Sequence, residues 1–244
     1  MGFDITYHPI TESEILTCYF DLIADPSLRQ NVYDRFNLTQ DDRELVNCRL
    51  DTDFTAEPFN SGVGMALASA AGFYRKYWYI RGGAFSFILE EYPEFARYCR
   101  SWDLLLPKGK FPDRRPHLQA NYMVGCYLSE AGVLALRADA KTNKEVRTLL
   151  HELFSHGRLP IFMQALDYAA ENKTGLIEAS EIVEPDPFSL ENSGFRSNPD
   201  NCDMQGVSLY VSAATEQVSQ AMAQQQNGAA ARPAGFWQWI KRWF

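Results

Sequence analysis

Two histidines, His151 and His156, are the first residues whose type and spacing suggest a chemical site. Zinc proteases carry two histidines four positions apart on one helical face, with an intervening glutamate as general base. Glu152 lies between the two histidines here, but their spacing is five, which turns His156 away from the face of His151. Because Gly157 follows directly, we expect His156 at the C-terminal end of a helix, where a cation is favoured. We predict no metal site.

Cys202 is the candidate nucleophile of a hydrolase, with His117 or His156 as its base. Such a pair needs spatial proximity and an oxyanion hole, and the sequence signals neither. Neighbouring acids such as Asp203 raise a thiol pKa instead of lowering it. The five cysteines are scattered, and no two have the CxxC spacing of a zinc or redox site. We interpret Cys202 as a structural cysteine and keep a Cys/His hydrolase as an alternative.

Two glycines, Gly62 and Gly64, stand where a phosphate-binding loop would begin a helix. The third glycine of such a loop is missing, no Lys-Ser/Thr pair follows, and the preceding residues do not form a buried strand. We therefore interpret this segment as a helix start whose glycines permit a tight turn, and we predict no cofactor.

Acidic side chains gather in three places along the chain. Those around Asp41 and Glu94 suit helix N-termini, where the helix dipole favours negative charge. The third group consists of Glu178, Glu181, Glu184 and Asp186. We predict that these four acids line one solvated face that a cationic protein recognises. A hydrolase using paired carboxylates stays an alternative, because that chemistry needs two carboxyl groups facing each other across a cleft.

The last ten residues, 235–244, contain three of the five tryptophans, Trp237, Trp239 and Trp243, together with Lys241 and Arg242. This aromatic, basic segment has three interpretations: it docks on the body of the protein, anchors in a partner's groove, or lies weakly in a membrane interface. An Ala/Gln-rich linker before it favours independent movement. We include the three tryptophans among the predicted partner-binding residues.

The composition is that of an ordinary globular protein. The chain has 244 residues, of which 46% are hydrophobic, 14% aromatic and 22% charged, which excludes collagen-like, disulfide-scaffold and disordered classes. Before Ser212 there are 20 basic and 30 acidic side chains, a net charge of −10. An acidic body repels phosphate, so we expect no nucleic-acid partner.

Helices dominate the predicted elements. Thr11 and Glu14 form a capping box before a first helix, and Thr39 caps another. Residues 3–7 alternate as a strand that we expect to stop at Pro9. Further helices are predicted over 27–38, 63–79, 84–91, 93–102, 142–153 and 159–172, and one over 213–234 that passes into a linker. Residues 122–138 and 176–183 suit strand or helix, whereas 104–116 and 184–201 are rich in turn residues.

These elements predict a mainly α fold with a minor β component, an α+β protein. Residues 1–211 form one compact, mainly helical globular domain, 212–234 the Ala/Gln-rich helix end and linker, and 235–244 a flexible aromatic-basic tail.

The expected location is the cytoplasm. The first residues lack the basic region of a signal peptide, and dispersed single cysteines suit a reducing compartment. The longest charge-free stretch, between Glu57 and Arg75, contains a proline and three glycines and falls short of the ~20 apolar residues of a membrane helix.

Three segments carry a resemblance: Gly2–Ile10, Gly175–Glu181 and Asn201–Asp203. They resemble small bacterial proteins, several of which are similar to immunity proteins encoded beside interbacterial toxins. The resemblance implies a protein that binds one toxin and blocks it without catalysis of its own. It transfers no functional residue, because the immunity proteins share no binding motif.

Taken with the acidic body, this resemblance leads us to expect a non-catalytic cytosolic binding protein, most concretely an immunity protein that occludes a cationic toxin. The alternatives are the hydrolase and a peripheral membrane protein tethered by its Trp-rich tail.

Overall fold

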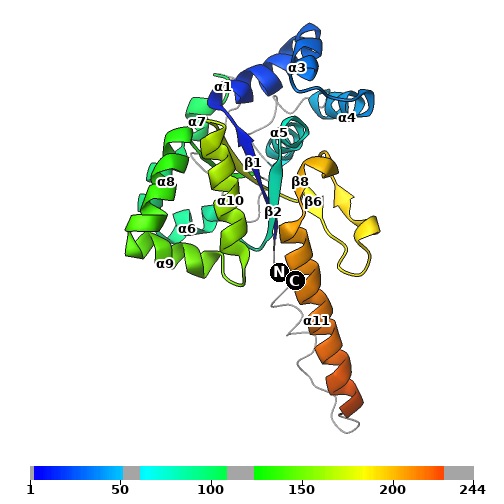
Figure 1. Cartoon of the computed structure of the whole chain (residues 1–244). Helices are drawn as coiled ribbons and strands as arrows, with labels where there is room; N and C mark the ends of the chain where they lie inside the picture. The colour runs from blue at the N-terminus through cyan, green and yellow to red at the C-terminus, as the bar shows by residue number, and fades with distance from the viewer. Residues whose placement is uncertain (1–2, 52–60, 109–123, 228–244) are drawn as a thin grey trace.

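The computed structural model describes residues 3–51, 61–108 and 124–227 (Figure 1). A six-stranded sheet runs through the centre of the molecule in the order β3-β4-β5-β1-β2-β8, and a separate ribbon pairs β6 with β7. The strands are β1 (Asp4–Ile10), β2 (Tyr77–Arg81), β3 (Cys99–Arg100), β4 (Val124–Leu128), β5 (Gly175–Ser180), β6 (Val183–Glu184), β7 (Gly194–Phe195) and β8 (Cys202–Asp203). The predicted tail 235–244 and the linker residues from 228 lie outside the described residues.

Strand β1 is central and pairs antiparallel with both β2 and β5. Its Ile5 lies opposite Ile80 on one side and Ser180 on the other, while β8 joins the far side of β2 in parallel. The prediction that this strand stops at Pro9 is wrong, because Pro9 pairs with Leu176. The pairing with β2 has already ended at Tyr7, so Pro9 has a ladder neighbour on one side only, where a proline is tolerated.

Helices cover both faces of the sheet, and the strand period of two sends neighbouring side chains to opposite cores. Figure 1 shows the green helices to the left of β1 and β2 and the blue helices above these strands. One core holds Tyr7 and Leu176 beneath α6 (Phe85–Glu91), α8 (Glu130–Thr142), α9 (Lys144–Leu153) and α10 (Arg158–Glu171). The other holds Ile10 and Ile177 beneath α1 (Glu12–Ile15), α2 (Asp21–Ala24), α3 (Arg29–Arg35), α4 (Gln40–Leu50), α5 (Ser61–Tyr74) and α7 (Trp102–Leu105), together with the π-helical turn η1 (Leu16–Phe20).

The predicted fold class, mainly α with a minor β component, is confirmed. So are the capping box at Thr11, whose hydroxyl accepts the backbone N–H of Glu14, and the helix start at Thr39, where the structure adds a second capping box with Asp42. Of the two undecided segments, 176–183 contains β5, and 122–138 contains β4 followed by α8, which is capped by Ser129.

Three predicted boundaries are wrong. The helix expected over 63–79 ends at Tyr74, because its aromatic end, from Tyr77, forms the buried strand β2. The segment 93–102 is a 3-10 helix followed by β3, and α7, over residues 102–105, includes the first two residues of the expected loop 104–116. The C-terminal helix α11 (Gln205–Asn227) begins eight residues before the predicted start, so the domain limit at 211/212 lies within it. No helix in the described ranges has the length and hydropathy needed to cross a membrane.

His8 gives the sheet a sensitivity to acid. Its ring is fully buried and stacks on Tyr77 at 4.8 Å between ring centroids. The Thr6 hydroxyl lies 2.9 Å from His8 Nε2 and donates to the Ala179 carbonyl, so we assign the ring proton to Nε2. Desolvation lowers the pKa of His8 from 6.5 to about 3.

We expect His8→Phe to remove this acid sensitivity. The unfolded chain takes up a proton at His8 near pH 6.5 and the folded chain does not, so stability falls with falling pH between 6.5 and 3. At pH 4 the wild-type chain should have lost about 3 kcal/mol more of its unfolding free energy, relative to pH 7, than His8→Phe. Urea unfolding at both pH values measures the difference, and parallel losses in the two proteins would show that His8 does not contribute.

Candidate functional site

Three of the four predicted acids meet on the surface. Glu181, Glu184 and Asp186 line an open hollow of about 440 Å³, together with Asp4 and Pro185. We call these five residues the acidic hollow. It lies where β1 begins, β5 ends and β6 follows, and Figure 1 shows the yellow β6–β7 ribbon beside the start of α11, away from α8 and α9.

The backbone of Glu181 shapes the hollow. β5 ends at Ser180, and Glu181 then adopts the left-handed conformation, with φ of 61°. Its N–H donates to the Asp4 carbonyl at 2.8 Å, which ties the turn to the first residue of β1. The next two residues, Ile182 and Val183, are buried, so the turn leaves the Glu181 side chain exposed at the rim of a rigid element. A left-handed glutamate is uncommon, because a residue with a Cβ is strained in this conformation, and the hydrogen bond to Asp4 holds it here.

The hollow keeps an excess of negative charge. Asp4 is paired with Arg81 at 2.6 Å and accepts the Tyr79 hydroxyl, and Glu184 pairs with Arg196 at 2.7 Å. Two arginines therefore offset two of the four carboxylates. Among the described residues no ion pair joins Asp186 or Glu181 to a cation.

Asp186 is fixed by its own loop. Its carboxylate accepts the backbone N–H groups of Phe188 at 2.8 Å and Ser189 at 3.2 Å, which orders the segment between β6 and β7. This segment presents Phe188 with 75% of its surface exposed and Leu190 with 44% exposed. The loop therefore holds an exposed aromatic side chain beside a carboxylate that has no ion-pair partner in the described residues.

Glu178, the fourth predicted acid, does not share this face. It is 3% exposed inside β5, so the prediction that all four acids line a solvated face is wrong for this residue. Its carboxylate accepts the Ser86 N–H at 3.1 Å, the Ser86 hydroxyl at 2.5 Å and the Tyr7 hydroxyl at 3.1 Å. Ser86 belongs to the first turn of α6, so Glu178 satisfies one of the free backbone donors of that helix, and the Tyr7 hydroxyl accepts another, the N–H of Phe85.

The space for this carboxylate comes from Gly125, where an added Cβ would lie 1.9 Å from Glu178 Oε1. Burial raises the pKa of Glu178, although the hydrogen bonds from Ser86 oppose the shift. The buried carboxyl is a packing and capping element of the interior.

The other candidates from the sequence lie apart from the hollow. Cys202 is buried in β8, and burial raises the pKa of its thiol to about 12, so it lacks the thiolate that the hydrolase alternative requires. His156 lies in the turn between α9, which ends at Leu153, and α10, and has φ of 57°; the prediction that it ends a helix is wrong, because it stands directly before Gly157, the N-cap of α10. No group of three or more metal-ligating side chains occurs within the described ranges. His117, Trp237, Trp239 and Trp243 lie outside the described residues.

Sequence reasoning missed Asp4 and Phe188. Asp4 reaches the hollow only through the pairing of β1 with β5, whose partner residues lie 165 to 175 positions apart in the chain, and no local sequence pattern indicates it. Phe188 did have a signal, because it is one of two aromatic residues, with Phe195, in the turn-rich polar segment 184–201.

We expect Glu181→Gly to raise the free energy of unfolding by up to about 1 kcal/mol. Glycine adopts a positive φ without the steric cost that a Cβ imposes, although it also adds entropy to the unfolded chain. Glu181→Ala retains the Cβ and removes the same charge, so it should show no such increase. Urea unfolding of the two variants tests this, and equal stabilities would mean that Glu181 is not strained.

A scan of protein-family models and searches of curated proteins and of solved structures found no match to this chain.

Proposed function

We propose that this chain is a non-catalytic cytoplasmic binding protein that docks a cationic protein on the acidic hollow and the adjoining Phe188. In its most concrete form the partner is a bacterial toxin, and the chain acts as its immunity protein. The observation that carries this proposal is the meeting of Glu181 and Asp186, neither offset by a cation, with an aromatic side chain that is 75% exposed.

The two parts of the surface do different work in binding. The uncompensated carboxylates attract a basic surface over a distance of about 8 Å at physiological salt, which speeds encounter and selects cationic partners. Phe188 supplies the apolar contact that slows dissociation, as buried aromatic anchors do in other interfaces. Neither part requires a conformational change, because Glu181 and Asp186 are held by backbone hydrogen bonds.

The mechanism of neutralisation is occlusion. A toxin that acts on an anionic substrate presents cationic groups at its active site, and the acidic hollow would cover them. The resemblance of Gly2–Ile10 and Gly175–Glu181 to proteins similar to immunity proteins supports this form of the proposal. Both segments border the hollow, since Asp4 lies in the first and Glu181 ends the second.

A pull-down with the protein encoded by the adjacent gene tests the proposal. The tagged full chain should recover that protein at physiological salt, and recovery should fall as salt is raised. Phe188→Ser should reduce recovery at least tenfold, because the anchor is lost. Leu104→Ser is the matched control, since Leu104 is 61% exposed on α7, outside the hollow, and should leave recovery unchanged.

Failure to recover the adjacent protein, together with failure to recover any basic protein from the parent cells, would contradict the proposal. Equal effects of Phe188→Ser and Leu104→Ser would show that binding uses another surface.

A further inference from the structure

A second hollow lies on the other side of the Asp4–Arg81 pair. It is an apolar groove of about 210 Å³ between α10, β2 and the first half of α11. Its apolar lining includes Ile80, Ile161, Leu209, Ala213 and Ala214. Figure 1 shows α11 leaving the body beside α10 and β2, so the groove forms where this helix departs.

The groove has a fixed shape because α11 is tightly seated on β2. A Cβ added at Gly206 would lie 1.7 Å from the Tyr79 carbonyl oxygen, so only glycine permits this approach. Tyr210, one turn further along α11, packs its ring 4.8 Å from the Arg81 guanidinium carbon. The wall between the acidic hollow and the groove is therefore the row formed by Asp4, Arg81 and Tyr210.

Arg158 is the charged feature of the groove. Its side chain is partly buried and makes three hydrogen bonds, to the Ser155 carbonyl at 2.7 Å, the Ser155 hydroxyl at 3.1 Å and the Arg81 carbonyl at 2.7 Å. All three acceptors are neutral, and no carboxylate lies within ion-pair distance of Arg158 in the described part of the chain. A guanidinium has five N–H groups, so two donors remain.

Three ionisable basic side chains line the groove, Arg81, His156 and Arg158, and Arg158 is the arginine among them that no carboxylate offsets in the described residues. Arg81 also lines it, but Asp4 offsets that guanidinium at 2.6 Å. The lining contains neither Asp nor Glu. Desolvation lowers the pKa of Arg158, which is the electrostatic cost that a bound anion would relieve.

We propose that this groove binds a small aromatic monocarboxylate, with the ring system against Ile161 and Leu209 and the carboxylate on Arg158. The size follows from the volume, because a cavity of about 150 Å³ holds benzene and the groove has room for a two-ring system. The charge follows from one uncompensated guanidinium, whose planar donors match a carboxylate and whose single charge suits a monoanion better than a phosphate dianion. This site is separate from the acidic hollow and does not depend on the protein partner.

The test is an NMR titration of the full-length chain with 1-naphthoate. We expect saturable shifts confined to α10, β2 and the first half of α11, with a dissociation constant of about 1 mM or below. The neutral analogue 1-naphthalenemethanol should bind at least tenfold more weakly, and so should 1-naphthoate to Arg158→Gln. Because Arg158 also supports the Ser155 turn, the amide spectrum of Arg158→Gln must first show an intact fold.

A second pair of variants tests the groove without touching Arg158. Ala213→Phe fills the mouth from an exposed position and should abolish binding, whereas Ala223→Phe lies further along α11, outside the groove, and should bind as the wild-type chain does. Equal binding of 1-naphthoate and its neutral analogue, or unchanged binding to Ala213→Phe, would overturn the proposal. Binding that appears only after removal of residues 235–244 would also overturn it, since this chain's own segment would then be the occupant.

Discussion

Glu178→Ala is expected to lower the free energy of unfolding by about 3 kcal/mol. The substitution removes the acceptor of the Ser86 N–H and of the Ser86 hydroxyl and leaves a cavity beside Gly125, whereas the Tyr7 hydroxyl keeps the Gly83 carbonyl as its acceptor at 2.8 Å. A buried donor left without a partner costs about 1 to 3 kcal/mol, and a cavity adds to that cost. Removing the carboxyl also removes the cost of desolvating its charged form on folding, and this offsets part of the lost unfolding free energy.

Glu178→Gln is the matched variant and should cost less than about 1 kcal/mol at neutral pH. Its amide keeps an acceptor for the Ser86 N–H and can donate to the Ser86 hydroxyl. Because burial raises the folded-state pKa, the wild-type carboxyl contributes its full stability below about pH 4.5 and loses it as the pH rises through the folded value. The glutamine has no such dependence.

Urea unfolding separates the two variants, and partner affinity provides the second measurement. If Glu178 caps α6, the glutamine variant binds the partner as the wild-type chain does. If a stably folded Glu178→Gln variant instead lost much of its affinity for the partner, Glu178 would belong to the binding surface.

Local sequence signals predicted the capped helices well. Thr11 with Glu14 and Thr39 with Asp42 are short-range patterns whose hydrogen bonds close within one turn, so they do not depend on the rest of the fold. The helix end at Tyr74 was missed, because an Ala-rich helix runs directly into an aromatic segment whose strand conformation depends on pairing with β1.

The spacing of the acids misled the prediction for the same reason. Glu178, Glu181 and Glu184 recur every three residues, which suits one face of a helix, but Glu178 lies in β5, which is covered on both sides, Glu181 in the turn after it and Glu184 in β6. All of β5 is buried, so a solvated acid becomes possible only after Ser180. Three acids of the hollow could therefore be named from the sequence. The burial of Glu178 and the position of Asp4 beside these acids could not, because both depend on how the strands of the sheet pair.

Reversing two charges in the hollow is expected to weaken partner binding by about 100-fold. Glu181→Lys with Glu184→Lys changes the charge by four units beside Asp4 and Asp186, and like charges facing a basic partner cost several kcal/mol. Both side chains are exposed, but Glu184→Lys replaces the ion pair with Arg196 by two like charges, so the unfolding free energy should fall by about 1 kcal/mol and leave the chain folded.

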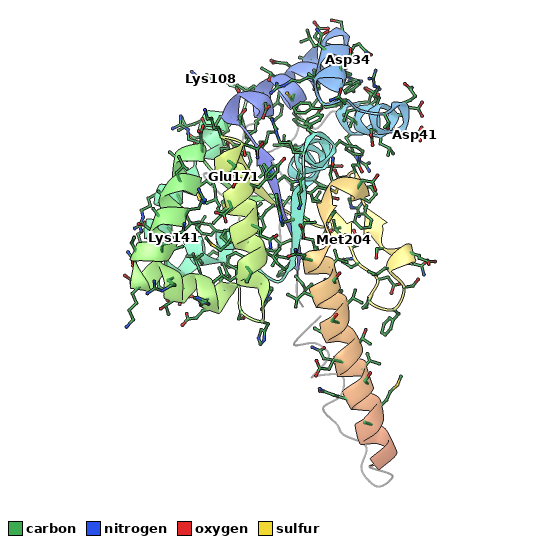
Figure 2. The ribbon with its side chains drawn as sticks, viewed as in Figure 1. Asp34, Asp41, Lys108, Lys141, Glu171 and Met204 are labelled. Carbon is green, nitrogen blue, oxygen red and sulfur yellow. The ribbon has the colours of Figure 1, made fainter. Side chains whose placement is uncertain are left out.

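The control carries the same change of charge on another surface. Glu152 on α9 and Glu171 on α10 are exposed, and Figure 2 shows Glu171 on α10, well away from the β6–β7 ribbon. Glu152→Lys with Glu171→Lys gives the chain the same net charge as the hollow variant. Any difference in partner affinity between the two double variants therefore reflects the position of the changed charges and not the total charge.

The most direct test of the acidic hollow is the association and dissociation rates of the two doubles with the partner at physiological salt. The account predicts that the hollow double loses about 100-fold in affinity, largely through a slower association, while the control double stays within about threefold of the wild-type chain. Equal losses in the two doubles would contradict it, because the partner would then sense only net charge and the acidic hollow would not be its binding site.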